Sequence, residues 1–166
     1  MVVLRYQPLR ALPEHAYVPG RDAHRPDTAG EHSSGAESPA ASYLPDERWR
    51  DNTEYLWGID LYNHGFFWEA HEAWEGLWRA AERDALQRRF LQGLIQCAAA
   101  CLKAAMGDAD ACRRLTARGL ARLERVGADR SGRYMGLDVG ELVTEFRSFA
   151  EAAVVVIERR PWLRLA

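Results

Sequence analysis

The chain has 166 residues, of which 48% are hydrophobic, and a formal net charge of −2 at pH 7. This length predicts one domain with a sizeable core, and the near-neutral charge argues against nucleic-acid and anionic-lipid partners. There is no signal-peptide pattern and no apolar run long enough to span a membrane, and the three cysteines are typical of a reducing compartment. We therefore expect a cytoplasmic protein that binds neither nucleic acid nor membrane.

The N-terminal region, residues 1–45, holds six of the seven prolines together with Gly, Ser and scattered charge. This composition predicts an extended, partly flexible segment ahead of a single helical domain over residues 46–166. Tyr17-Val18-Pro19-Gly20 is followed by His24 and His32. These histidines either contribute to a site or are incidental residues of a disordered leader, and both interpretations stay open.

Helical periodicity starts after Pro45 and continues to Pro161. The expected helices are Asp46–Trp57 leading into Glu54–His64, then Phe67–Ala81, Asp84 to about Met106, Asp108 to about Arg125, and Asp138 to Pro161. Residues 127–136 are expected to form a loop, and the apolar helix from Asp84 is expected at the centre. The predicted fold is therefore all-α, a bundle of about five to six helices with tetratricopeptide-like antiparallel hairpins. A homodimer is the default expectation for such helix faces.

The stretch from Tyr55 to Arg79 holds four of the six tryptophans and two of the five histidines. On a helix over Phe67–Ala81, His71 and Glu75 lie four residues apart at the edge of the apolar stripe. A charged group at that boundary needs a partner, because burying it alone is costly. This pair is therefore the first candidate for a site.

Four motifs occur together: Tyr62-Asn63-His64-Gly65, the run Glu69–Glu75, Leu77-Trp78-Arg79, and the run Phe90–Gln96. In order and spacing, residues 52–125 resemble the bacterial and archaeal family called domain of unknown function 309. The resemblance implies an all-helical, tetratricopeptide-like bundle. It implies no established activity, although the family has been suggested to contain metal-dependent hydrolases.

The sequence His71-Glu72-x-x-Glu75 is similar to the zinc-protease helix motif with its second histidine replaced by glutamate. In this interpretation His71 and Glu75 bind a divalent metal, and Glu72 acts as the base that takes a proton from water. A third ligand is needed. The candidates are His64, which we include in the predicted metal site, Glu69, and the leader histidines.

The remaining predicted site residues would line an aromatic-walled ligand pocket around this cluster: Trp68, Trp74, Arg79, Gln92 and Gln96. The protein would then be a metal-dependent hydrolase or a small-ligand-binding protein. In the alternative, the same polar groups form a structural network across two helices, with a His71–Glu75 hydrogen bond, Arg79 paired with Glu75 or Glu72, and Gln92 and Gln96 facing them. A helical face would then bind a peptide or partner helix. Arginines supply nearly all the positive charge and do not cluster visibly along the sequence. We expect Cys97 and Cys101 to be small core residues.

Overall fold

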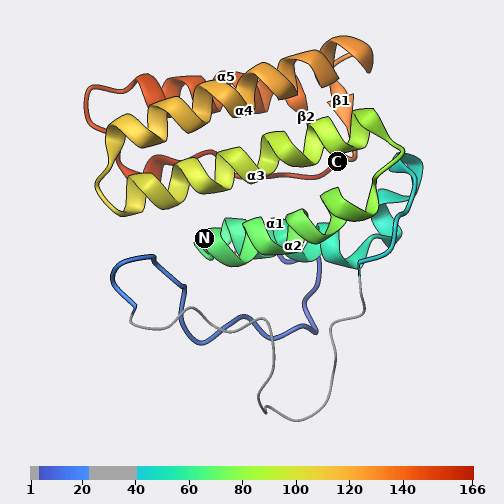
Figure 1. Cartoon of the computed structure of the whole chain (residues 1–166), viewed down its shortest axis with the longest axis horizontal. Coiled ribbons are helices and arrows are strands. Elements are labelled where there is room, and N and C mark those ends of the chain that lie inside the picture. The colour runs from blue at the N-terminus through green and yellow to red at the C-terminus, as the bar shows by residue number, and fades with distance from the viewer. Residues whose placement is uncertain (1–3, 23–40) are drawn as a thin grey trace.

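The computed structural model describes residues 4–22 and 41–166. Its elements are a 3₁₀ helix η1 (Asp46–Asp51), then α1 (Thr53–Asn63), α2 (Phe67–Ala80), α3 (Ala85–Ala105) and α4 (Ala109–Asp129), the short strands β1 (Arg133–Tyr134) and β2 (Leu137–Asp138), then α5 (Val139–Glu151) and a 3₁₀ turn η2 (Ile157–Arg159). Five α-helices and two 3₁₀ segments thus make up nearly all the regular structure of the described residues (Figure 1). The predicted all-α bundle is confirmed.

Aspartate caps begin three of these helices where the sequence predicts them. The side chains of Asp84, Asp108 and Asp138 each accept a hydrogen bond from the backbone N–H three residues later, at 2.9 Å. Such bonds satisfy donors that have no partner within the helix. The predicted starts of α3, α4 and α5 are therefore confirmed.

Glycine ends two of the helices. Gly65 and Gly107 have φ angles of +88° and +81°, a region that glycine enters without steric cost. At each site the N–H of the following residue bonds the carbonyl five residues before it, as in Phe66 to Leu61 at 2.9 Å. This is the Schellman ending, and it turns the chain back so that α1–α2 and α3–α4 become antiparallel hairpins.

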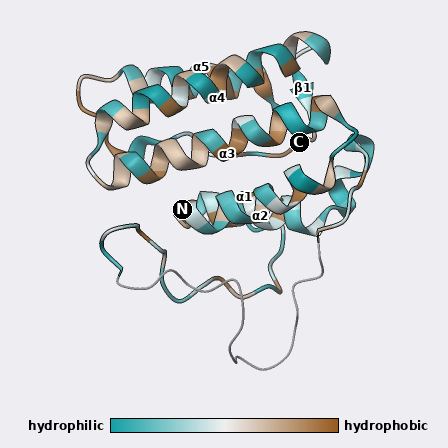
Figure 2. Cartoon of the chain, viewed as in Figure 1, coloured by the Kyte–Doolittle hydropathy of each residue, from teal (hydrophilic) through white to brown (hydrophobic). Residues whose placement is uncertain are grey.

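Consecutive helices pack against each other, and α3 lies between α2 and α4 (Figure 1). The predicted central position of this helix is therefore confirmed. Hydrophobic and hydrophilic residues share both α3 and α4 (Figure 2), as amphipathic helices require. The largest fully buried side chains include Trp74, Tyr55, Phe90 and Phe146. Within the described part of the chain, no helix has the length and apolar character of a membrane span.

The end of the last helix differs from the prediction. Helix α5 stops at Glu151, ten residues before Pro161, and Ala152 already has an extended ψ of 143°. Three consecutive valines follow, whose branched side chains are poor helix formers. The chain instead runs back across α1, where Asn63 bonds both the N–H and the carbonyl of Leu163 at 2.9 Å. Helical periodicity over Asp138 to Pro161 predicts that Ala153 and Ile157 lie on the buried face of this helix. That prediction is wrong, because Ala153 is exposed and Ile157 only half-buried.

Two further boundaries differ. Helix α4 continues to Asp129 rather than Arg125 because Val126, which is completely buried, extends its apolar face. The predicted loop over residues 127–136 contains β1, which pairs with β2 in an antiparallel hairpin. Its two-residue turn has positive φ at both Met135 and Gly136. Such turns match the twist of paired strands. Before α1, η1 and the cap at Asn52 replace the helix expected over Asp46–Trp57.

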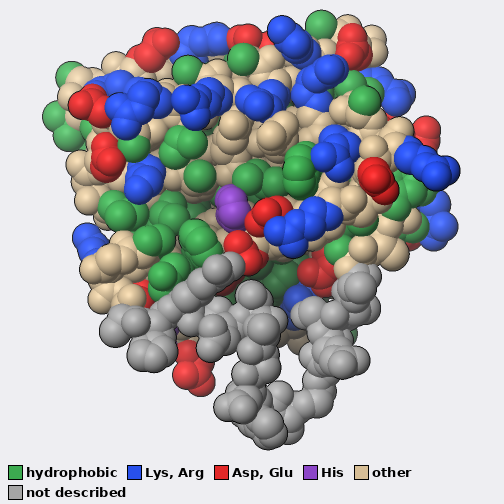
Figure 3. Space-filling model, viewed as in Figure 1, with side chains coloured by type: hydrophobic (Ala, Val, Ile, Leu, Met, Phe, Trp, Pro, Cys, Tyr) green, Lys and Arg blue, Asp and Glu red, His purple; other side chains and the backbone are tan. Residues whose placement is uncertain are grey.

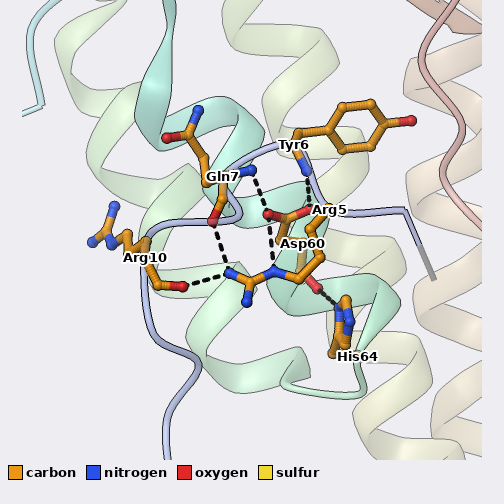
Figure 4. Close-up of polar contacts among 6 residues, drawn as sticks. All are labelled: Arg5, Tyr6, Gln7, Arg10, Asp60 and His64. Atoms are coloured by element: carbon orange, nitrogen blue, oxygen red, sulfur yellow. Dashed lines mark hydrogen bonds and ion pairs between the residues drawn. The ribbon is translucent and has the colours of Figure 1, made fainter. Parts of the chain in front are cut away.

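Residues 4–22 form a strap without helix that lies along α1 and the start of α2. Asp60, which is completely buried in α1, accepts the backbone N–H groups of Tyr6 and Gln7 at 2.8 and 2.7 Å (Figure 4). The guanidinium of Arg5 lies 3.5 Å from the same carboxylate. The expected flexible run over residues 31–41 and the histidines at 24 and 32 fall outside the described residues, apart from Ala41.

Candidate metal centre

The candidate centre lies on one turn of α2. Nδ1 of His71 is 3.4 Å from Oε1 of Glu72 and 4.0 Å from Oε2 of Glu75, and one ligand-type atom from each residue lies within 4.8 Å of the others. All three side chains are half-buried, with 25–30% of their surface exposed. His71 and Glu75 are four residues apart and Glu72 and Glu75 are three apart, so each of these pairs consists of neighbours on the helix surface and Glu75 joins the other two into one cluster.

An unsatisfied ring nitrogen adds to the evidence for a ligand. Nδ1 of His71 is buried and has no hydrogen-bond partner in the described structure, because its contact with Glu72 lacks hydrogen-bond geometry. One face of the imidazole ring stacks on the indole ring of Trp68, with the ring centroids 5.6 Å apart and an angle of 20° between the ring planes. Trp68 in turn packs edge-on against Tyr17 of the strap at 5.2 Å. The imidazole is therefore held in place with a free nitrogen directed toward two carboxylates.

This donor set fits a divalent transition metal. One imidazole nitrogen and two carboxylate oxygens are ligands that zinc, manganese and iron accept. Around a zinc ion with ligand distances of about 2.0–2.2 Å, tetrahedral ligands lie roughly 3.3–3.6 Å apart. The 3.4 Å between His71 and Glu72 falls in this range, whereas Glu75, at 4.0 Å from His71, would have to move closer on metal binding. Since every protein ligand comes from one helical turn, the remaining coordination positions face away from α2. Open positions of this kind are typical of catalytic rather than structural sites.

The structure places the predicted pocket residues in three different surroundings. Arg79 bonds Glu75 at 2.8 Å, although 69% of its side chain is exposed, so this pair is worth little. Gln92 and Gln96 accept hydrogen bonds at 3.0 Å from Arg122 of α4, and not from the cluster on α2. The hydrogen bond expected between His71 and Glu75 in the structural alternative is not formed. The polar network predicted across α2 and α3 is thus replaced by one across α3 and α4.

Two other predicted residues lie apart from the cluster. The ring of His64 bonds the carbonyl oxygen of Asp60 at 2.8 Å, at the end of α1, and the described cluster does not include it. Trp74 is completely buried, and its indole N–H is 3.4 Å from the carbonyl of Tyr55, so it belongs to the core. Cys97 and Cys101 are also core residues, and burial raises the pKa of Cys101 to about 12.

Glu69, the other third-ligand candidate on α2, binds the strap. Its Oε1 accepts the N–H of Tyr17 at 2.8 Å, while Oε2 is buried without a partner among the described residues. Burial raises the pKa of Glu69 above its ordinary value, and the hydrogen bond from Tyr17 offsets part of that rise. Glu69 therefore fixes the strap beside Trp68 and His71.

Sequence reasoning missed two features. Asp60 anchors the strap, and an aspartate in the middle of an otherwise apolar helix was the available signal. Arginines that are scattered in the sequence gather between α2, α3 and α4, which corrects the expectation that basic residues do not cluster. No motif spacing reveals this group, because the antiparallel packing of α3 and α4 creates it.

No curated protein and no solved structure matches this chain. A family model, described as Domain of unknown function (DUF309), matches residues 55–115. The matched segment covers most of α1, all of α2 and α3 and the start of α4, and with them the whole candidate metal centre. The resemblance indicated by the sequence motifs is thereby confirmed for residues 55–115, which are similar to the DUF309 family.

Proposed function

We propose that His71 and Glu75 bind one divalent metal ion at the surface of α2, with Glu72 beside it as the general base. The observation that carries the proposal is the convergence of three ligand atoms within 4.8 Å around a buried imidazole nitrogen that has no hydrogen-bond partner. Buried polar atoms are almost always satisfied, so an unpaired one facing two carboxylates calls for an explanation. A bound cation provides that explanation, because it would take the lone pair of the ring nitrogen.

The reaction class that fits best is hydrolysis. A divalent metal ion in an open site lowers the pKa of water and polarises a substrate carbonyl or phosphoryl oxygen. His71 and Glu75 hold the ion from one side, and Trp68 keeps the imidazole in its orientation. Glu72 lies beside them and is the carboxylate placed to accept the proton of the attacking water.

The experiment that tests this proposal is elemental analysis of tag-free protein purified without chelators. Wild type should contain close to one equivalent of zinc, manganese or iron, and His71→Ala and Glu75→Gln should lose it. Glu141→Gln is the matched control, because Glu141 is an exposed carboxylate on α5. Equal metal content in Glu75→Gln and wild type would refute the assignment, as would a wild type that stays empty after incubation with a panel of divalent ions.

Loss of metal must be separated from loss of fold. Glu75→Gln removes only the largely exposed pair with Arg79, which is worth about 0–1 kcal/mol, so the helical circular dichroism should not change. If metal is present, hydrolysis of phosphoester, ester and amide model substrates by wild type and Glu72→Gln then tests the base. A Glu72→Gln variant that keeps its metal and its full activity would remove Glu72 from that role.

A second candidate is an interaction module of the tetratricopeptide kind. In Figure 3, hydrophobic side chains lie to the left of and above the histidine near the centre of the face, with acidic and basic side chains to its right. Such a mixed surface suits a peptide or partner helix. In that case the polar cluster would be structural. A metal-free wild type that binds a helical peptide, with affinity unaffected by Glu75→Gln, would support this function over the first.

A further inference from the structure

A cavity of about 610 Å³ lies between the end of α2, the first turns of α3 and the last turns of α4. Its lining has an unusual charge for a chain of net charge −2, with five arginines and one glutamate. The lining residues are Trp78, Glu82, Arg83, Ala85, Arg88, Arg89, Gln92, Ala121, Arg122 and Arg125. Basic side chains also follow α4 across the face shown in Figure 3.

Two of these arginines are fixed by neutral partners. The guanidinium of Arg88 lies 4.1 Å from the ring centre of Trp78 and donates to that residue's carbonyl oxygen at 3.0 Å. Arg122 donates to the side-chain oxygens of Gln92 and Gln96, each at 3.0 Å. Hydrogen bonds to amide and carbonyl oxygens hold both groups in position but leave their positive charges uncompensated.

The other three arginines lack effective acidic partners. Arg83 and Arg125 are exposed, and neither forms a salt bridge within the described part of the chain. Arg89 lies 4.0 Å from Asp129, a pair in which both side chains are more than one-third exposed. Glu82 also has no ion pair with a described residue, so it neutralises none of them directly. Several like charges around one cavity repel each other unless an anion binds there.

We propose that this cavity binds a phosphate group, either free or carried by a small organic molecule. Guanidinium groups match the geometry of phosphate oxygens with paired N–H donors, and they keep their charge at any physiological pH. The cavity volume falls in the range of small-molecule sites, and an extended strand of nucleic acid would need a longer groove. Trp78 is seven residues from His71, roughly 10 Å along α2, so the site does not depend on the proposed metal.

The test is isothermal titration of the full chain with inorganic phosphate, pyrophosphate and adenosine monophosphate in low salt. The variant is Arg83→Glu/Arg125→Glu, which changes two exposed arginines that hold no described partner. The matched control is Arg114→Glu/Arg159→Glu, which makes the same change in net charge at exposed positions outside this cavity. We expect the cavity variant to bind pyrophosphate at least about ten-fold more weakly, and the control to change less than about two-fold.

Each outcome of the titration has a distinct meaning. Tighter binding of adenosine monophosphate than of phosphate assigns an organic phosphate, and the reverse order assigns the free ion. Equal weakening in both variants would overturn the proposal, because only overall charge would then matter. If none of the three phosphate probes produces heat of binding at millimolar concentration, the proposal is also overturned. The same holds if a single-stranded oligonucleotide binds but the small phosphates do not. Elemental analysis tests the metal centre separately, so the two proposals can fail independently.

Discussion

Replacing Asp60 with asparagine tests how the strap is held on the helices. In the native structure each carboxylate oxygen of Asp60 accepts one backbone N–H, from Tyr6 and from Gln7, and Arg5 lies alongside. An asparagine keeps one acceptor oxygen and presents an NH₂ group in place of the other. One N–H would then be buried without an acceptor, and the attraction to Arg5 would be lost.

The cost follows from these contacts. An unsatisfied buried donor costs about 1–3 kcal/mol, and a hydrogen bond to a charged group contributes about 1.5–3 kcal/mol. Because Asp60 is completely buried, we expect Asp60→Asn to lower the free energy of unfolding by about 2–4 kcal/mol. For a chain of this size, that corresponds to a fall in melting temperature of roughly 4–16 °C.

Urea denaturation gives the stability, and hydrogen exchange at Tyr6 and Gln7 reports whether the strap stays docked. Glu54→Gln is the matched control on the same helix, since its pair with Arg10 is more exposed, and we expect a cost of about 1 kcal/mol or less. Unchanged urea midpoint and unchanged exchange rates in Asp60→Asn would refute the view that this carboxylate holds the strap.

Two further predictions concern packing and pH. A Cβ at Gly58 would lie 2.1 Å from the indole nitrogen of the buried Trp74. Gly58→Ala should therefore lower the free energy of unfolding, measured by urea denaturation, by about 1–3 kcal/mol or more. In Gly140→Ala the new Cβ meets nothing closer than 3.6 Å, so this variant should stabilise α5 by about 0.5–1 kcal/mol. The raised pKa of Glu69 means that its contribution to stability is greatest below its ordinary pKa of 4.5 and is lost as pH rises through the folded-state value. Glu69→Gln should therefore gain stability relative to wild type between pH 4.5 and pH 7, and a constant difference between the two proteins over that range would contradict the cause given for the shift.

The starts of the helices were predictable because the signals are local. Asp84, Asp108 and Asp138 cap the helix that follows within three residues, and a glycine such as Gly65 ends one at its own position. The grouping of His71 with Glu72 and Glu75 was predictable for the same reason, because one helical turn contains all three.

Features that depend on distant contacts were not predictable. The path of the chain after α5 includes the binding of Leu163 to Asn63, one hundred positions earlier in the chain. The partners of Gln92 and Gln96 depend on which helix supplies Arg122. Periodicity shows that a face is polar or apolar, but it does not identify the neighbour that covers the face.

The return of the C-terminal segment across α1 has a consequence for folding during synthesis. The hairpins α1–α2 and α3–α4 are local and can form as the chain leaves the ribosome. The polar groups of Asn63, however, find their partners in residues 160 and 163, and the hydroxyl of Tyr6 accepts the N–H of Leu165 at 2.9 Å. Helix α1 is thus closed by residues about one hundred positions later in the chain, so its final packing must wait until they have emerged.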